Sequence, residues 1–198
     1  MTVLTGKICL VTGGTRGLGL GIAKQLGGAG ATVYVTGRTL KKKTGNIPGS
    51  LEETAKEIEA RGGRCVPVVC DHSKDDDIQA LFSRISKDEG RLDILVNNAY
   101  SAVNCTTQAA KLMVPRRHGL IVNISSPAGL RYLFNVPYGI GKEASPIVFW
   151  RNPQGSKYFD STSRFVLAGW SPRSKPCSVL TSLRAYIERP MKSNPPVT

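Results

Sequence analysis

The sequence is poor in residues that coordinate metals or form disulfide networks. It contains five cysteines and two histidines among 198 residues, and the cysteines do not fall at the short spacings of a zinc site. His72 and His118 lie far apart in the sequence without companion ligands, so no metal site is expected. An odd number of scattered cysteines excludes a regular disulfide framework and favours a reducing, intracellular environment.

Long apolar runs are also lacking. No stretch approaches the roughly 18 consecutive apolar residues of a transmembrane helix, and the beginning of the sequence lacks the apolar core of a secretory signal. The sequence therefore predicts no transmembrane segment and an intracellular, cytoplasmic protein.

Acidic side chains are scarce relative to basic ones. The 27 Lys and Arg residues outnumber the 14 Asp and Glu residues, which gives a net charge of +13. Residues 1–144 contribute +7 (19 basic, 12 acidic) and residues 145–198 contribute +6 (8 basic, 2 acidic). Without an arginine-rich helix, a zinc finger or an aromatic-studded basic sheet, this excess does not predict nucleic-acid binding. A basic coenzyme pocket and a basic tail account for it.

Strand-like and helix-like patterns alternate over the first two thirds of the chain. Pro67 lies in the third strand-like run and cannot donate a hydrogen bond to a sheet, so that strand is expected at a sheet edge. The alternation predicts an α/β fold with a Rossmann-like, doubly wound parallel sheet between two helical layers (three-layer αβα). The predicted strands are "KICLVT", "TVYVT", "CVPVV", "LDILV" and "LIVNIS", which begin at residues 7, 32, 65, 92 and 120.

Capping residues mark where the helices between these strands begin and end. Ser50 and Glu53 form a capping box at the start of "LEETAKEIEA", and Gly62 supplies the stop after it. Ser73 and Asp76 are candidate caps for the next helix. Apolar residues at helical spacing define the first and third helices, namely Leu18, Ile22, Ala23 and Leu26 in one, and Ile78, Leu81, Phe82 and Ile85 in the other.

The pattern changes after the fourth strand. Only 20 residues separate Asn98 from Gly119, enough for one short helix, expected at residues 106–114. After Ala144 the periodicity is lost, and "RFVLAGW" is the only strand-like run. We therefore predict a Rossmann domain over residues 1–144 and a weakly ordered basic tail over residues 145–198. The sheet is then incomplete at its C-terminal edge, which is exposed unless the tail or another subunit covers it.

A glycine-rich turn follows the first strand in "VTGGTRGLG". Gly13, Gly17 and Gly19 recur as G-x-x-x-G-x-G between a strand and a helix, where glycine permits a sharp turn and close approach of a pyrophosphate. An ordinary glycine turn is the alternative, but the position between strand and helix favours dinucleotide binding. The predicted binding loop also contains Thr15, Arg16 and Leu18.

The second strand ends in "VTGRT", where an acidic residue would accept the ribose hydroxyls of NAD(H). Arg38 occupies this region instead, and Arg16 lies within the glycine turn. Two guanidinium groups suit a 2′-phosphate, so NADP(H) is favoured over NAD(H). A solvated surface arginine is the alternative interpretation of Arg38.

The segment "NVPYGIGKEA" contains a tyrosine and a lysine four residues apart. On a helix, Tyr138 and Lys142 would share one face, and the ammonium would lower the pKa of the phenol. A tyrosine of this kind can exchange a proton with a substrate oxygen near neutral pH. Taken alone, such a pair is more often a surface tyrosine beside a solvated lysine.

Together, "VTGGTRGLG", "CVPVVCD", "LDILVNNAY" and "ISSPAGLRYLFNVPYGIGK" resemble the short-chain dehydrogenase/reductase family, in particular a branch that tolerates Tyr100 after N-N-A. The resemblance extends from Thr2 to about residue 144. It implies that Asp71 contacts the adenine and that Asn97 and Asn98 steady the fourth strand beside the coenzyme. For the two asparagines, a purely structural role in tying down loops is the alternative.

The resemblance also implies a reaction. Lys142 would hold the nicotinamide ribose and lower the pKa of Tyr138, which would protonate a carbonyl oxygen. Ser126, or alternatively Ser125, would hydrogen-bond the same oxygen. The expected activity is an NADP(H)-dependent oxidoreductase that interconverts a small-molecule carbonyl and a secondary alcohol, and endoplasmic reticulum association is a further expectation from the family.

The sequence departs from the family in two places. The family has a longer segment before its serine, with a helix whose asparagine completes a proton relay; Asn104 lies too close to Ser126 to be assigned that role. Pro146 would stop the helix that carries Tyr138 and Lys142. Because family dimers commonly use the two helices shortened here, a family-type homodimer is not expected. The alternative function is an inactive NADP-binding remnant or interaction protein from a spliced or mis-assembled chain.

Overall fold

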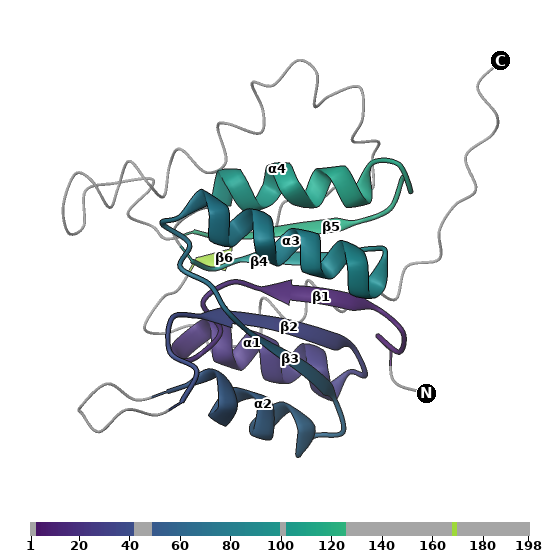
Figure 1. The fold of residues 1–198 in the computed structure, drawn as a ribbon. Coiled ribbons are helices and arrows are strands. Elements are labelled where there is room, and N and C mark those ends of the chain that lie inside the picture. The colour runs from purple at the N-terminus through teal and green to yellow at the C-terminus, as the bar shows by residue number, and fades with distance from the viewer. Residues whose placement is uncertain (1–2, 42–48, 100–101, 126–167, 170–198) are drawn as a thin grey trace, which may run out of the picture.

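The computed structural model describes residues 3–41, 49–99, 102–125 and 168–169. Along these ranges strands and helices alternate (Figure 1), as the sequence predicts. The elements are β1 (Ile8–Val11), α1 (Gly17–Gly28), β2 (Thr32–Gly37), α2 (Leu51–Glu59), β3 (Arg64–Val69), α3 (Asp75–Glu89), β4 (Ile94–Asn97), α4 (Ala102–Met113), β5 (Leu120–Ser125) and β6 (Ala168–Gly169).

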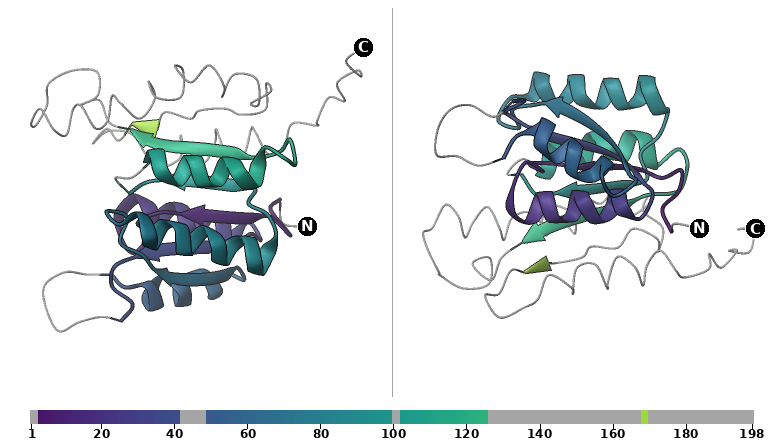
Figure 2. Two further views of the ribbon diagram at one scale, coloured as in Figure 1. Left: turned by 45° about the horizontal axis from the view of Figure 1, so that its top comes forward. Right: turned by 90° about the horizontal axis from the view of Figure 1, so that it is seen from below.

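The strands form one parallel sheet in the order β3-β2-β1-β4-β5-β6. Helices α1 and α2 cover one face, and α3 and α4 cover the other (Figure 2). The predicted α/β class with a Rossmann-like, three-layer αβα architecture is therefore confirmed. None of the described helices has the length and apolarity that crossing a membrane requires.

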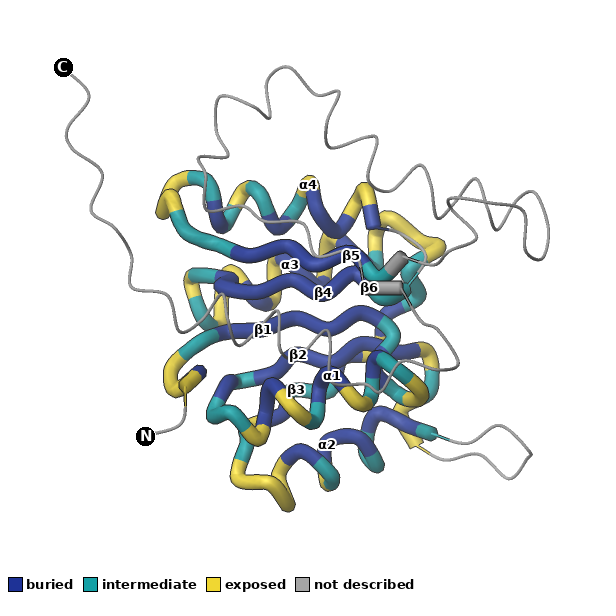
Figure 3. The backbone as a smooth tube through the Cα atoms, turned by 180° about the vertical axis from the view of Figure 1, so that it is seen from behind, coloured by how far each residue is buried: buried dark blue, intermediate teal, exposed yellow. Residues whose placement is uncertain are grey.

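Burial on both faces explains why the strands are continuous apolar runs. In β1, Cys9 and Val11 belong to the core beneath α1 and α2, whereas Ile8 and Leu10 belong to the core beneath α3 and α4. This alternation is the two-residue period of a β-strand. Figure 3 shows the resulting distribution, with buried strands at the centre and exposed residues on the outer helical surfaces.

Two local predictions are confirmed. Pro67 lies in β3, which pairs only with β2 among the described strands, so the missing proline N–H falls at a sheet edge. The Ser50 hydroxyl accepts a hydrogen bond of 3.2 Å from the backbone N–H of Glu53, as an N-cap of α2 should. The Ser50 cap fixes where α2 begins.

Two helix starts differ from the prediction. The N-cap of α3 is Lys74, without a side-chain capping bond; the Ser73 hydroxyl instead donates to the carboxylate of Asp71. Three consecutive aspartates in the first turn provide favourable charge at this helix terminus. Helix α4 begins at Ala102 rather than residue 106, because its buried stripe already starts at Ala102 and Cys105. These small side chains give a weak apolar signal in the sequence.

Within the described residues, the two-residue strand β6 extends the sheet beyond β5. Ala168 pairs with Ile124 and Gly169 with Ser125, both in parallel register. This short strand comes from "RFVLAGW", the run singled out in the sequence. Within the described ranges, residues 120–123 of β5 have no strand partner on that side, and the expected incompleteness of this edge stays a prediction because residues 126–167 and 170–198 lie outside the described residues.

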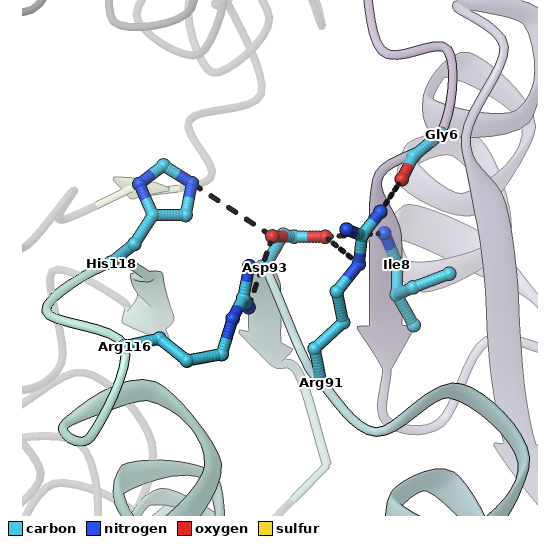
Figure 4. A network of polar contacts seen from close by, with 6 residues as sticks. All are labelled: Gly6, Ile8, Arg91, Asp93, Arg116 and His118. Atoms are coloured by element: carbon cyan, nitrogen blue, oxygen red, sulfur yellow. Dashed lines mark hydrogen bonds and ion pairs between the residues drawn. The ribbon is translucent and has the colours of Figure 1, made fainter.

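An ion cluster lies at the amino edge of the sheet, where the strands begin (Figure 4). Its centre is the buried carboxylate of Asp93, which accepts a hydrogen bond of 2.9 Å from the backbone N–H of Ile8. Three cationic or titratable side chains surround it at 3.4 to 3.8 Å, namely Arg91, Arg116 and His118. The cluster ties the start of β1 to the segments before β4 and β5.

Candidate functional site

The candidate site lies at the opposite, carboxyl edge of the sheet and begins with the glycine turn. Gly13 and Gly17 have φ angles of 67° and 55°, a region that residues with a side chain rarely adopt. The N-cap of α1, Arg16, is exposed and makes no side-chain capping bond. The first N–H groups of α1 therefore present an uncapped, partially positive helix terminus to an anion.

Gly19 is required for close packing. A Cβ at this position would lie 2.5 Å from the carbonyl oxygen of Gly13 and 2.6 Å from Nδ2 of Asn98. Nδ2 of Asn98 donates hydrogen bonds of 3.0 Å to the carbonyls of Thr12 and Gly13. Asn98 thus links the glycine turn to the end of β4, which is the tying role that asparagines often have.

Thr12 contributes to the same link and was not identified from the sequence. Its hydroxyl oxygen accepts bonds of 2.9 Å from the backbone N–H groups of Asn98 and Ala99 and donates to the carbonyl of Val96. The only available signal was its position directly after a buried strand, where residues of a parallel sheet line the binding edge.

Asn97 lies beneath α4 rather than in the turn. Its Nδ2 donates to the hydroxyl of Thr106, at 2.9 Å, and to Oδ1 of Asn123, at 2.8 Å. The three side chains are buried, and Oδ1 of Asn97 and Nδ2 of Asn123 have no hydrogen-bond partner among the described residues. Thr106 and Asn123 were also missed, because neither residue type is unusual in a helix or a strand. Asn97 therefore steadies β4, β5 and α4 together.

The end of β2 supports the glycine turn from the other side. The backbone N–H of Gly13 donates to Oγ1 of Thr36 at 3.2 Å, and the N–H of Gly14 donates to the Thr36 carbonyl at 3.0 Å. Thr15 packs its methyl group against Gly37, where a Cβ would approach Thr15 Cγ2 within 2.5 Å. Leu18 packs against the core beneath α1 and α2, so its side chain serves the fold.

Arg38 and Asp71 follow β2 and β3 at this edge. Arg38 is exposed, as is Arg16 in the turn. Hydrogen bonds from the backbone N–H and the hydroxyl of Ser73 lower the pKa of Asp71, and the nearby Arg38 guanidinium adds to this effect. Asp71 is therefore an ionised acceptor within electrostatic reach of Arg38.

The predicted chemical residues Ser126, Tyr138 and Lys142 lie outside the described residues. Ser125, the alternative serine, is the last residue of β5 and is in register with Gly169. Asn104 lies on α4, where its Nδ2 donates to Oδ1 of the exposed Asp75 at 2.6 Å. The described part of the chain thus contains most of the residues predicted to bind the coenzyme, whereas those predicted to carry the reaction lie outside it.

This arrangement matches known proteins in sequence and in structure. A family model described as "short chain dehydrogenase" matches residues 7–100. The chain belongs to the short-chain dehydrogenase/reductase family. It is 43% identical over 173 residues to the mouse and human proteins named "Dehydrogenase/reductase SDR family member 1", covering 71% of this chain and 53% of each relative.

A solved structure of the short-chain dehydrogenase/reductase family is similar as well. It is a metagenomic short-chain oxidoreductase in complex with NADP, with a TM-score of 0.80 and 25% sequence identity, over 95% of this chain and 93% of that one. The chain spans about half the length of the curated mouse and human relatives it matches. It is thus an oxidoreductase family member of the kind that binds NAD(P).

Proposed function

We propose that the protein is an NADP(H)-dependent oxidoreductase that interconverts a carbonyl and a secondary alcohol on a small molecule. The observation that carries this proposal is the uncapped N-terminus of α1 beside the Gly13–Gly17 turn, flanked by the exposed Arg16. This combination provides backbone N–H groups and positive charge for a pyrophosphate.

The described residues fit the adenosine half of such a coenzyme. Gly13, Gly17 and Gly19 would let the pyrophosphate approach the backbone, together with the N–H groups of Thr15 and Leu18. Two arginines at the same edge, Arg16 and Arg38, would bind the 2′-phosphate through charge-assisted hydrogen bonds, which favours NADP(H). Asp71 would accept a hydrogen bond from the adenine amino group.

The reaction requires residues contributed by the later part of the chain. The bound coenzyme supplies the hydride. Lys142 would hold the nicotinamide ribose and stabilise the phenolate form of Tyr138, so that Tyr138 can exchange a proton with the substrate oxygen near neutral pH. Ser126, with Ser125 as the alternative, would orient that oxygen through a hydrogen bond. Residues 1–144 would form this catalytic domain, and residues 145–198 a divergent tail.

A second function is a protein that binds NADP(H) without turning over substrate. The observation that favours it is the short connection after β4, where α4 begins only three residues after Ala99. Only 20 residues separate Asn98 from Gly119, fewer than the resemblance to the family leads us to expect, and the chain spans about half of the relatives it matches.

One set of measurements separates the two. NADPH and NADH are titrated into the full chain by coenzyme fluorescence, and NADPH oxidation is then followed across a panel of ketones and aldehydes. We expect tighter binding of NADPH and a turnover that is lost in Tyr138→Phe. Binding without oxidation of any carbonyl favours the second function, and no binding of either coenzyme by folded protein overturns both.

A further inference from the structure

His72 follows Asp71 at the carboxyl end of β3 and is mostly buried among polar groups of the candidate site. Its Nε2 lies 2.6 Å from Oγ1 of Thr36, and its Nδ1 lies 3.5 Å from Sγ of Cys105 in α4. The Thr36 hydroxyl is the same group that accepts the hydrogen bond from the backbone N–H of Gly13. His72 is thus two hydrogen bonds away from the first glycine of the turn.

The positions of the protons follow from the contacts. Thr36 is fully buried, so its hydroxyl proton needs an acceptor, and its oxygen is already used as the acceptor for Gly13. Among the contacts of this hydroxyl in the described residues, Nε2 of His72 is the group that can accept its proton, so Nε2 is assigned as the unprotonated nitrogen. The proton of the neutral ring lies on Nδ1 and points to the sulfur of Cys105.

The protonation states of Cys105 and His72 are compatible with this assignment. Burial raises the pKa of the Cys105 thiol to about 12, so its sulfur stays neutral at physiological pH. Burial also lowers the pKa of His72, in spite of the nearby carboxylates of Asp71 and Asp77. A neutral imidazole with an acceptor at Nε2 is therefore available around neutral pH.

We propose that His72 is a positioning residue for coenzyme binding, which holds the Thr36 hydroxyl in the orientation that anchors the Gly13 N–H. The inference rests on the proposed binding of a dinucleotide by the glycine turn. An acceptor at the Nε2 position fixes the hydroxyl rotor of Thr36, so that its lone pair faces Gly13. Without that acceptor the buried hydroxyl turns to another group, and the turn loses one of its two anchors on β2.

Two isosteric substitutions test the position of the acceptor. The glutamine amide is one bond longer than the asparagine amide, so His72→Gln places an oxygen near Nε2 whereas His72→Asn places its amide near Nδ1. Both replacements are neutral, which leaves the charge of the site unchanged at pH 7.5. We expect the Kd for NADPH to rise about tenfold in H72N, as the loss of one buried hydrogen bond predicts, and to stay within about threefold of wild type in H72Q.

Cys105→Ala serves as the matched control, since it removes the partner of Nδ1 and leaves Nε2 and Thr36 in place. We expect its Kd to stay within about threefold of wild type. Equal affinity of H72N and wild-type protein, or equal weakening in H72Q and H72N, would overturn the inference. Thermal unfolding of each variant excludes a general loss of structure as the cause.

A second readout does not require the coenzyme. Nuclear magnetic resonance of ¹⁵N-labelled protein should show His72 as the Nδ1–H tautomer, and the Gly13 amide should exchange with solvent faster in H72N than in H72Q. If wild-type protein binds no NADPH, the proposed function fails while these signals still decide the role of His72. An Nε2–H tautomer, or unchanged Gly13 exchange in H72N, refutes it.

Discussion

At the amino edge of the sheet, the carboxylate of Asp93 is enclosed by a backbone N–H and three side chains. At the carboxyl edge, the N-cap residue of α1 makes no side-chain capping bond, and the arginines at positions 16 and 38 are exposed. Buried charge at the amino edge is satisfied within the protein. At the carboxyl edge the backbone is held in place by neutral groups, and positive charge faces outward.

The comparison shows how a parallel sheet can place the groups that stabilise the fold at one edge and the groups that could bind a ligand at the other. Every strand begins at one edge and ends at the other, so the two edges differ in the direction of their backbone dipoles and in which loops meet there. An ion cluster at the amino edge stabilises the fold without competing for a ligand. At the carboxyl edge, Thr12, Thr36 and Asn98 shape the glycine turn through hydrogen bonds and leave the helix terminus open.

The largest expected effect comes from breaking the amino edge. Asp93→Ala leaves the buried N–H of Ile8 without an acceptor and removes the counter-charge of Arg91 and Arg116. We expect a loss of about 3 kcal/mol in the free energy of unfolding, measured by urea denaturation. Asp93→Asn, which keeps an acceptor for Ile8, should lose less.

The affinity of the Asp93 variants for NADPH is the control measurement. Because the cluster lies across the sheet from the glycine turn, the folded fraction of each variant should bind NADPH as wild type does. A loss below about 1 kcal/mol in D93A would show that the cluster does not hold the strands together.

The next effect is a steric change at the carboxyl edge. In Gly19→Ala, the new methyl group would collide with the Gly13 carbonyl and the Asn98 amide, so the turn must shift at a cost of about 2 kcal/mol. We expect weaker NADPH binding as well as lower stability, measured by fluorescence titration and urea denaturation.

Gly21→Ala is the matched control on the same helix. No described residue outside the helix comes within 4 Å of a Cβ at Gly21, so alanine should stabilise α1 by about 0.5–1 kcal/mol through its higher helix propensity. Binding that is weakened equally by both substitutions would contradict the role of Gly19 in the turn.

The order of strands and helices along the chain could be predicted from the sequence. Alternating apolar runs, Pro67 at an edge and Ser50 at a helix start are local signals, and the structure confirms each of them. The start of α4 was missed because Ala102 and Cys105 give little hydrophobic contrast. The N-cap of α3 was misassigned because Ser73 has a competing local partner, the Asp71 carboxylate.

In the candidate site, the sequence predicts the glycines most directly. Their spacing follows from the backbone requirements of a turn, which act within one loop. The contacts of Thr12, Thr36 and His72 join residues from different strands and α4, and no short-range pattern encodes them. The contacts of Asp93 likewise join three segments, namely the start of β1 and the segments before β4 and β5, and no local pattern indicates them.

A charge reversal at each edge should affect coenzyme choice differently. Arg38→Asp replaces a cation near the expected 2′-phosphate with an acceptor for ribose hydroxyls. We expect the ratio of NADPH to NADH affinity to fall about tenfold, which corresponds to about 1.4 kcal/mol.

Arg61→Asp is the control for this change. Arg61 is exposed after α2, on the side of the sheet where β3 begins, and its reversal changes the net charge by the same amount. The affinity ratio should stay at its wild-type value in R61D. A similar fall in both variants would mean that net charge, rather than the position of Arg38, sets the preference.

The smallest expected effect is the pH dependence of the two histidines, one at each edge. Burial lowers the pKa of His72, and the carboxylates of Asp71 and Asp77 oppose this shift. Burial also lowers the pKa of His118. The cations Lys7, Arg116 and Arg91 add to the shift at His118, and Asp93 opposes it. A lowered pKa means that the unfolded chain binds more protons, so stability is complete above the ordinary value of about 6.5 and falls as the pH drops through it.

Replacing each histidine with glutamine removes one titrating group and should flatten this fall. His118 lies closer to solvent and beside Asp93, so its protonation is partly compensated, whereas protonation of His72 places a proton on the nitrogen that accepts from Thr36. Urea denaturation between pH 5 and 7.5 should therefore show a greater flattening in H72Q than in H118Q. A greater flattening in H118Q than in H72Q would show that the histidine at the amino edge has the more strongly lowered pKa, which contradicts the expected difference between the two edges.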